Sequence, residues 1–284
     1  MRITPLWSDK DRCGLWVLGP RSREVRPELV QRYLERIGVR HPVEPTTPTL
    51  VELTSRHLES VPFENLGAHL GEQVSLSANE LLDKIVHRRR GGICYELNGA
   101  FALLLRAVGF EVDLLAGRIP RAGGEFGPPF GHLALLVRTR TPTLVDVGFA
   151  NATVAFVPWE PGVTTPAGGH GLRLAKHGDV HVCSGAESLY TLETRPRELA
   201  DFAAMAWWQY NSPHSRFTQS LVCSRAVPGG RRTLAGHRLI DVSASGREER
   251  LLDDDEVLDC YRDEFGVRLT RVPPVRFPRL PRTA

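Results

Sequence analysis

The spacing of apolar residues changes at Gly109 in this chain of 284 residues. Before Gly109 the apolar residues recur at helical spacing, as in the series that begins at Ile93 and ends at Val108. After Phe110 the period becomes two, which is typical of strands with one buried face. The sequence therefore predicts helices first and short strands afterwards, in an α+β fold.

Proline and glycine mark the ends of the expected helices. Pro27 stands at the favoured first position of a helix that ends at Gly38, and further helices are expected over residues 49–60 and 77–89. The links between them are short, as in a helical bundle. A helix of about four turns then follows, with Cys94 in its first turn.

The strand-like part favours a small antiparallel barrel or sandwich. Strands are expected over residues 112–119, 132–137 and 143–147, and further short runs continue to residue 193. Residues 197–208 are expected to form a helix. The tail, residues 271–284, has four prolines and four arginines, and we expect it to be loosely held.

Composition excludes several classes of protein. The net charge of +3 argues against a dedicated nucleic-acid binder. No apolar run approaches the roughly 20 residues of a membrane span, and the first residues lack the apolar core of a signal peptide. Five dispersed cysteines without a CxxC pair favour a reducing compartment over disulfides or a zinc site. We therefore expect a cytoplasmic protein without a metal or a membrane partner.

Cys94 is the candidate nucleophile. It follows Gly91 and Gly92 and lies in the first turn of a helix, where unpaired backbone N–H groups and the helix dipole favour a thiolate. Isolated cysteines are more often small buried hydrophobes. The basic run His87–Arg90 before Cys94, and suitable partners downstream, favour the nucleophile here.

A nucleophilic cysteine needs a base and a group that orients the base. His132 opens an alternating strand, and Asp146 lies fourteen residues later in a second strand with the same alternation. If residues 138–140 form the hairpin turn, His132 lies opposite Asp146, with Cβ atoms about 4.5–5.5 Å apart. The pattern therefore predicts a Cys94–His132–Asp146 triad.

Several segments resemble one family. Residues 90–98, Arg-Gly-Gly-Ile-Cys-Tyr-Glu-Leu-Asn, resemble the Arg-Gly-Gly-x-Cys-x-Glu-x-Asn signature of the arylamine N-acetyltransferases. Val61–Leu66 matches the segment that precedes this signature in the family, and Val145–Phe149 matches the family's aspartate motif. Asn211–Phe217 is similar to a family segment near the coenzyme A site. The resemblance runs from about Val25 to Val272.

The resemblance implies three parts around a core like that of cysteine proteases. Residues 1–111 would be a helical bundle that carries the nucleophile, with residues 1–25 as an extension outside the resemblance. Residues 112–210 would be an antiparallel β-barrel that carries the histidine and the aspartate. Residues 211–284 would form an α/β lid.

Two residues depart from the family pattern. Ala150 stands where the family usually has a glycine, so we expect weak use of free acetyl-CoA. Gly131 stands where a larger, often polar residue is expected.

The resemblance also implies roles for individual residues. Cys94 would be acylated, His132 would activate it, and Asp146 would orient His132. Arg90 and Glu64 would form an ion pair that braces the site. Phe63 would line the acceptor pocket, and Phe149 and Phe217 would lie beside the coenzyme.

The expected activity is ping-pong acyl transfer. An acyl-CoA, most simply acetyl-CoA, would acylate Cys94, and an arylamine or arylhydrazine would then take the acyl group. An amide synthase of the same family, which closes a macrolactam from a substrate bound to an acyl carrier protein, would use the same triad. A papain-like or transglutaminase-like thiol enzyme and an inactive binding protein are the remaining alternatives.

Overall fold

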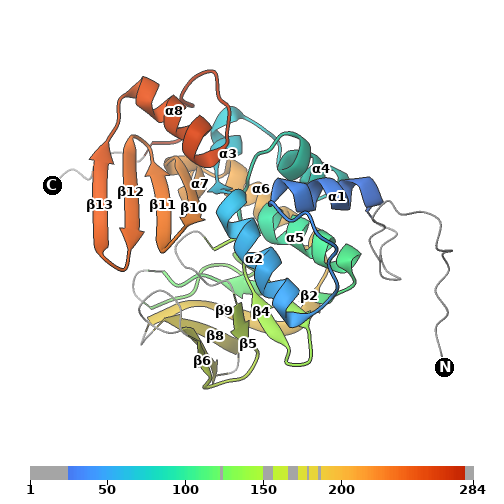
Figure 1. The fold of residues 1–284 in the computed structure, drawn as a ribbon. Helices are drawn as coiled ribbons and strands as arrows, with labels where there is room; N and C mark the ends of the chain where they lie inside the picture. Colours follow the sequence, from blue (N-terminus) through green and yellow to red (C-terminus); the bar gives the residue numbers. More distant parts are fainter. Residues whose placement is uncertain are drawn as a thin grey trace, which may run out of the picture.

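The structure is a computed structural model, and it describes residues 25–121, 124–149, 156–165, 172–177, 179–184 and 187–278. The expected α+β fold is confirmed: helices pack beside a barrel-like sheet, and a second sheet lies at the opposite side of the helices (Figure 1). Within the described residues, no helix combines the length and the apolar character that crossing a bilayer requires.

The N-terminal helices surround α5, of which every residue except Arg106 is buried. Ser77 caps the helix that follows it by accepting a hydrogen bond from the Glu80 N–H. That helix passes into a π-helical turn whose last bond runs from the Arg88 N–H to the Asp83 carbonyl. The helices are α1 (Pro27–Arg36), α2 (Thr47–Ser60), α3 (Leu66–Leu70), α4 (Ala78–Leu82), the π-helical turn (Asp83–His87) and α5 (Cys94–Val108).

The larger sheet has eight antiparallel strands in the order β5-β4-β3-β2-β9-β8-β7-β6. It curls into a nearly closed barrel, because Pro161, just after β5, forms a bridge with Leu174 in β7. Apolar side chains such as Leu136 and Val182 fill its interior. The strands are β2 (Glu111–Arg118), β3 (His132–Arg138), β4 (Thr143–Val145), β5 (Phe156–Pro158), β6 (Thr164–Thr165), β7 (Leu172–His177), β8 (Asp179–Ser184) and β9 (Glu187–Arg197).

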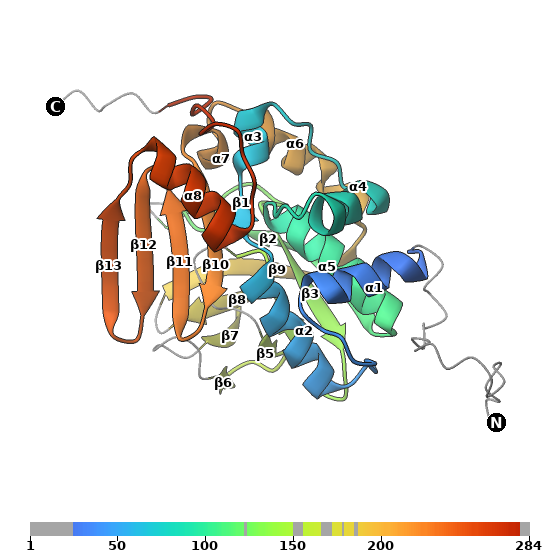
Figure 2. The ribbon, with the colours of Figure 1, turned by 45° about the horizontal axis from the view of Figure 1, so that its top comes forward.

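The smaller sheet joins the helical region to the last third of the chain. Its order is β1-β10-β11-β12-β13, so a strand from the helical region pairs with strands from the last third. Helix α8 covers one face of this sheet (Figures 1 and 2). The elements are β1 (Phe63–Glu64), α6 (Ala203–Asn211), α7 (Arg216–Gln219), β10 (Val222–Val227), β11 (Gly230–Ala235), β12 (Arg238–Ser243), β13 (Gly246–Leu251) and α8 (Asp254–Phe265).

Two of the sequence expectations about elements were wrong. The helical segment expected from residue 197 begins with a 3-10 turn at Leu199–Phe202, which leads into α6 at Ala203, because β9 continues to Arg197, which pairs with Leu114 of β2. Strand β13 was not predicted, because its sequence Gly-Arg-Glu-Glu-Arg-Leu is charged and its residues are all exposed at the sheet edge. Neither the end of β9 nor strand β13 shows the alternation of apolar and polar residues by which a strand is recognised in a sequence.

The first part of the tail is not loose. The Arg276 N–H donates to His69 Nδ1 at 3.0 Å, and Arg276 Nη1 donates to the Tyr210 carbonyl at 2.9 Å. The Phe277 N–H donates to the Thr218 carbonyl. These bonds fasten residues 276–277 onto α3, α6 and α7. The division of the chain at residues 111 and 210 stays a prediction, and Tyr210 itself packs into the core of the N-terminal helices.

Candidate active site

Cys94 is the first residue of α5 and is 4% exposed. The two glycines before it are required by close packing. A Cβ at Gly91 would lie 1.8 Å from the Pro62 carbonyl oxygen, and one at Gly92 would lie 2.6 Å from a Glu96 carboxylate oxygen. The Gly92 carbonyl in turn accepts the Glu64 N–H at 2.9 Å. The Gly-Gly pair therefore lets the chain pass along β1 and turn directly into α5.

His132 and Asp146 form a buried pair, with 2.7 Å between Nε2 and Oδ2. The hairpin register expected for them was wrong. Leu135 pairs with Val145 and Leu136 with Leu144, which shifts the ladder by two residues and leaves Asp146 just beyond the end of β4. A shift of two residues keeps each side chain on its face, so the imidazole and the carboxylate still meet.

Cys94 lies against the same pair. A Cβ at Gly148 would come within 2.7 Å of the Cys94 Cα, so the segment after Asp146 is in direct contact with the start of α5. Cys94 is also close enough to His132 to help raise the pKa of that histidine. The structure thus brings together the three residues that the sequence singled out.

The electrostatic environment holds the His132 proton firmly. Burial lowers the pKa of His132, but the charge and hydrogen bond of Asp146, together with the contact to Cys94, outweigh burial and raise this pKa to about 10. Burial would raise the pKa of Asp146, but the charge of His132 and its hydrogen bonds lower it. An imidazolium paired with a carboxylate is therefore the resting state at neutral pH.

Two further residues hold Asp146, and sequence reasoning gave neither of them a role. Asn98 Nδ2, one turn after Cys94, donates to Asp146 Oδ1 at 2.9 Å, and Tyr190 Oη donates to Oδ2 at 2.8 Å. The Gly148 N–H donates to Oδ1 at 2.9 Å. Asn98 lies in the signature stretch and could have been found from its helical spacing. Tyr190 comes from β9, and no local signal points to it.

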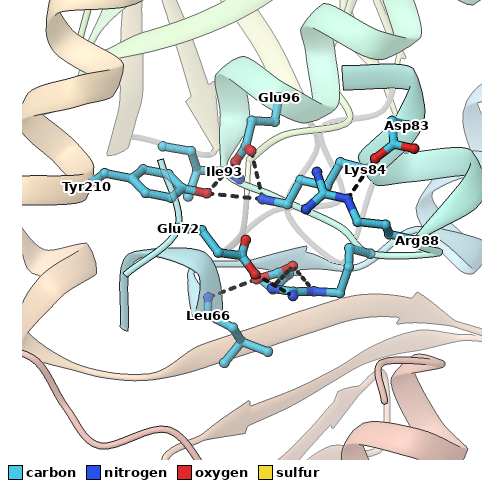
Figure 3. Close-up of polar contacts among 10 residues, drawn as sticks. Leu66, Glu72, Asp83, Lys84, Arg88, Ile93, Glu96 and Tyr210 are labelled. Carbon is cyan, nitrogen blue, oxygen red and sulfur yellow. Dashed lines mark hydrogen bonds and ion pairs between the residues drawn. The ribbon is translucent and has the colours of Figure 1, made fainter. Parts of the chain in front are cut away.

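The predicted ion pair of Arg90 and Glu64 is present below the nucleophile. Arg90 Nε donates to Glu64 Oε1 at 2.8 Å, and Arg90 Nη1 donates to Glu72 Oε1 at 3.1 Å. The Leu66 N–H donates a hydrogen bond to the second Glu64 carboxylate oxygen at 2.8 Å (Figure 3). Burial would raise the pKa of Glu64, but Arg90, Lys84 and the Leu66 N–H together lower it.

A second buried network beside this ion pair was not predicted. Lys84 Nζ donates to Glu96 Oε1 at 2.7 Å and to Tyr210 Oη at 3.1 Å, while Tyr210 Oη donates to Glu96 Oε2 at 2.7 Å (Figure 3). The same Glu96 oxygen accepts the Ile93 N–H at 3.0 Å. This network links the π-helical turn, α5 and α6, and it fixes the residue that precedes Cys94. It could not be read from the sequence because α6 lies more than a hundred positions away.

Comparison with known proteins identifies the family. The profile of the N-acetyltransferase family matches residues 46–273. The arylamine N-acetyltransferase of Mycolicibacterium smegmatis is 36% identical over 251 residues, which cover 84% of this chain and 91% of the relative. The chain belongs to the arylamine N-acetyltransferase family. It is therefore a transferase.

Solved structures of this family share the fold. The arylamine N-acetyltransferase of Mycobacterium marinum in complex with CoA aligns with a TM-score of 0.76 and 32% identity over 84% of this chain and 92% of that chain. The Nocardia farcinica arylamine N-acetyltransferase aligns with a TM-score of 0.77 and 31% identity over 89% and 93%, respectively.

Three aromatic residues were predicted to line the substrate sites of this arylamine N-acetyltransferase. They lie in two separate places. Phe149 contacts the rings of His132 and Tyr190, with centroids 5.4 and 5.0 Å apart. Phe63 and Phe217 contact each other at 5.7 Å. Their roles toward substrates stay predictions. Ala150 lies outside the described residues, as do residues 1–24 and 279–284.

Proposed function

We propose that this arylamine N-acetyltransferase carries an acyl group on Cys94, passing it from an acyl-CoA, most simply acetyl-CoA, to an arylamine or arylhydrazine. The contact of Cys94 with the buried His132–Asp146 pair is the observation that carries the proposal. The Mycobacterium marinum relative that was solved with CoA supports the donor.

In the first half-reaction Cys94, after giving its proton to His132, attacks the thioester carbonyl carbon through its sulfur. A new carbon–sulfur bond forms, the bond to the coenzyme A sulfur breaks, and the leaving thiolate takes the proton from the His132 imidazolium. A histidine pKa near 10 keeps this proton available at neutral pH. Asp146 stabilises the imidazolium and fixes its orientation.

In the second half-reaction His132 is neutral and acts as a base. The amine nitrogen attacks the carbonyl carbon of the Cys94 thioester and gives its proton to His132, and the Cys94 thiolate leaves. The product is an amide, and the resting imidazolium is restored. Phe63 would line the acceptor pocket, and Phe149 and Phe217 would lie beside the coenzyme.

Arg90 and Glu64 would act as a brace for this chemistry. Their ion pair holds β1 against the Gly-Gly segment, so the start of α5 cannot move away from His132. The same arrangement would serve an amide synthase with a carrier-bound donor, and only the choice of donor separates the two activities.

The test is the mass that the protein gains from a donor. On incubation with acetyl-CoA, the protein should gain the mass of one acetyl group, located on Cys94 by peptide mapping. The variant Cys94→Ser should gain none while keeping its fold, and the matched control Cys183→Ser should gain one as the wild type does. Malonyl-CoA and longer acyl-CoA donors report the acyl preference.

Acetylation elsewhere, or none with any acyl-CoA, would overturn the proposal. Acylation by a carrier-bound thioester in the absence of any reaction with acyl-CoA would instead favour the amide synthase.

A further inference from the structure

Three arginines from distant parts of the chain lie close enough for the charges of two of them to act on the third. Helix α2 packs against β10, and α1 packs against the π-helical turn. Arg36 is in the last turn of α1 and Arg225 is in β10, while Arg89 follows the π-helical turn. The Tyr33 hydroxyl and His57 Nε2 are 2.9 Å apart and join α1 to α2. Arg225 Nη1 donates to the Glu59 carbonyl at 2.9 Å and joins β10 to the end of α2.

Two of these arginines, Arg36 and Arg89, have no anionic partner among the described residues. Arg36 is only 8% exposed, yet its Nε has no acceptor, and the buried Nε of Arg225 has none either. A buried cation without a counter-charge costs free energy.

The neighbouring carboxylates are already engaged. Glu264 lies 3.7 Å from Arg225, but it also forms a closer ion pair with Arg232. Glu59 is paired with Arg56, and the Asp83 carboxylate with Arg88. The chain therefore leaves an excess of positive charge at this junction.

The charges of Arg89 and Arg225 act on Arg36. Burial and the charges of Arg89 and Arg225 lower the pKa of Arg36 to about 10. In addition, Arg89 has a φ of +51°, a conformation that residues with a side chain rarely adopt. The surrounding structure holds this strained residue, since the next residue's N–H is bonded to the Lys84 carbonyl at 2.9 Å.

We propose that Arg36, Arg89 and Arg225 bind an oxyanion of the phosphate type. Guanidinium groups carry donors in a fixed fork that matches phosphate oxygens, and they stay charged where a lysine would lose its proton. An anion here would supply acceptors for the two unpaired Nε groups. It would also tie α1 and β10 to residue 89, which is five positions before Cys94. The same chemistry is offered by a free phosphate ion and by a phosphate group of coenzyme A.

Thermal unfolding in the presence of inorganic phosphate tests the site. In a low-salt buffer, about 10 mM phosphate should raise the Tm of the wild type by about 2–4 °C. The variant Arg36→Met keeps the apolar stem but removes the charge, and its Tm should move by less than about 1 °C. The control Arg140→Met removes an exposed arginine from the β3–β4 loop and should respond as the wild type does.

A second variant covers the case in which Arg36→Met folds poorly. Arg89→Asn changes an exposed side chain, and asparagine tolerates a positive φ, so the fold is kept while one cation is lost. It should reduce the phosphate-induced rise in Tm by at least half. An equal rise in wild type, Arg36→Met and Arg89→Asn, or no rise in the wild type, would overturn the proposal.

Adding coenzyme A distinguishes the two sources of the anion. If saturating coenzyme A abolishes the further rise caused by phosphate, and Arg36→Met weakens coenzyme A binding, the site takes a phosphate group of the donor. If the two ligands raise the Tm additively, and Arg36→Met leaves coenzyme A binding unchanged, the site takes a free anion. Either result supports an oxyanion site.

Discussion

The carboxylate of Asp146 receives donors on both oxygens. His132 and Tyr190 share Oδ2, while Asn98 and the Gly148 N–H share Oδ1. A buried carboxylate that is satisfied in this way has one orientation, and it transmits that orientation to the imidazole. At the scale of single residues, the position of His132 therefore depends on a tyrosine and an asparagine that do not react.

Tyr190→Phe should expose this dependence. The variant keeps the ring contacts to His132 and Phe149 but removes the 2.8 Å hydrogen bond to Asp146. We expect a loss of about 1–3 kcal/mol in the free energy of unfolding and a several-fold slower acylation of Cys94. Urea unfolding and the rate of mass gain from acetyl-CoA measure the two effects.

Tyr261→Phe is the matched control, because its buried hydroxyl has no hydrogen-bond partner. It should leave the acylation rate unchanged and cost no stability. Equal effects of the two variants would contradict the role of Tyr190.

The His132–Asp146 pair also predicts how stability depends on pH. The His132 pKa rises from 6.5 in the unfolded chain to about 10 in the folded protein. Its contribution is therefore complete below pH 6.5 and is lost as the pH rises towards 10. The Asp146 pKa is lowered, so the contribution of Asp146 is lost only in acid.

We expect Asp146→Asn to lower the free energy of unfolding by about 3–5 kcal/mol near pH 6.5 and by clearly less near pH 10. Urea titrations of both proteins across this range measure the difference. A difference that does not change with pH would mean that the pair is not ionic in the folded protein.

At the scale of elements, the start of α5 is held from below by the Arg90 ion pair. Arg90 binds Glu64 of β1 and Glu72 after α3 through separate guanidinium nitrogens. Arg90→Lys keeps the charge but cannot hold both carboxylates at once. We expect a loss of about 2 kcal/mol in stability, together with a lower rate of acylation. Thermal unfolding and the acylation rate check this.

Arg88→Lys provides the comparison, because the side chains of Arg88 and its partner Asp83 are 44% and 48% exposed. An exposed pair contributes little, so this variant should stay within about 0.5 kcal/mol of the wild type. If Arg90→Lys behaved like Arg88→Lys, the brace would have no role.

At the scale of the whole molecule, Asn65 joins the helical region to the last third of the chain. Its Nδ2 donates to the carbonyls of Phe217 and Ser220 at 2.9 and 2.6 Å, and its Oδ1 accepts the Val222 N–H at 2.8 Å. The residue is completely buried. Asn65 therefore fixes how β10 and the α7 segment pack on β1.

Asn65→Asp should separate these parts. The aspartate would place a buried negative charge against two carbonyl oxygens, so we expect a loss of about 3–5 kcal/mol in stability. Native-state hydrogen exchange should show the largest loss of protection in β10. Asn79→Asp, an exposed change in the first turn of α4, should be neutral. Unchanged protection of β10 would contradict the linking role of Asn65.

The sequence by itself determined the features that depend on neighbours along the chain. Apolar period and capping residues located α1, α2, α4 and α5, because a helix is stabilised by contacts three and four residues apart. The glycines before Cys94 indicated a close approach of the backbone, and alternation placed His132 and Asp146 on one face, a result that the observed shift of two residues in the register leaves unchanged.

Only the tertiary structure decided which distant groups meet. The bond from Tyr190 to Asp146, the Lys84–Glu96–Tyr210 network and the junction of Arg36 with Arg225 each join segments separated by tens of residues or more. Such partners follow from the register and packing of whole elements, which no local pattern specifies. The charged edge strand β13 was not predicted from the sequence for the same reason. It is held by backbone pairing with β12 rather than by an apolar face.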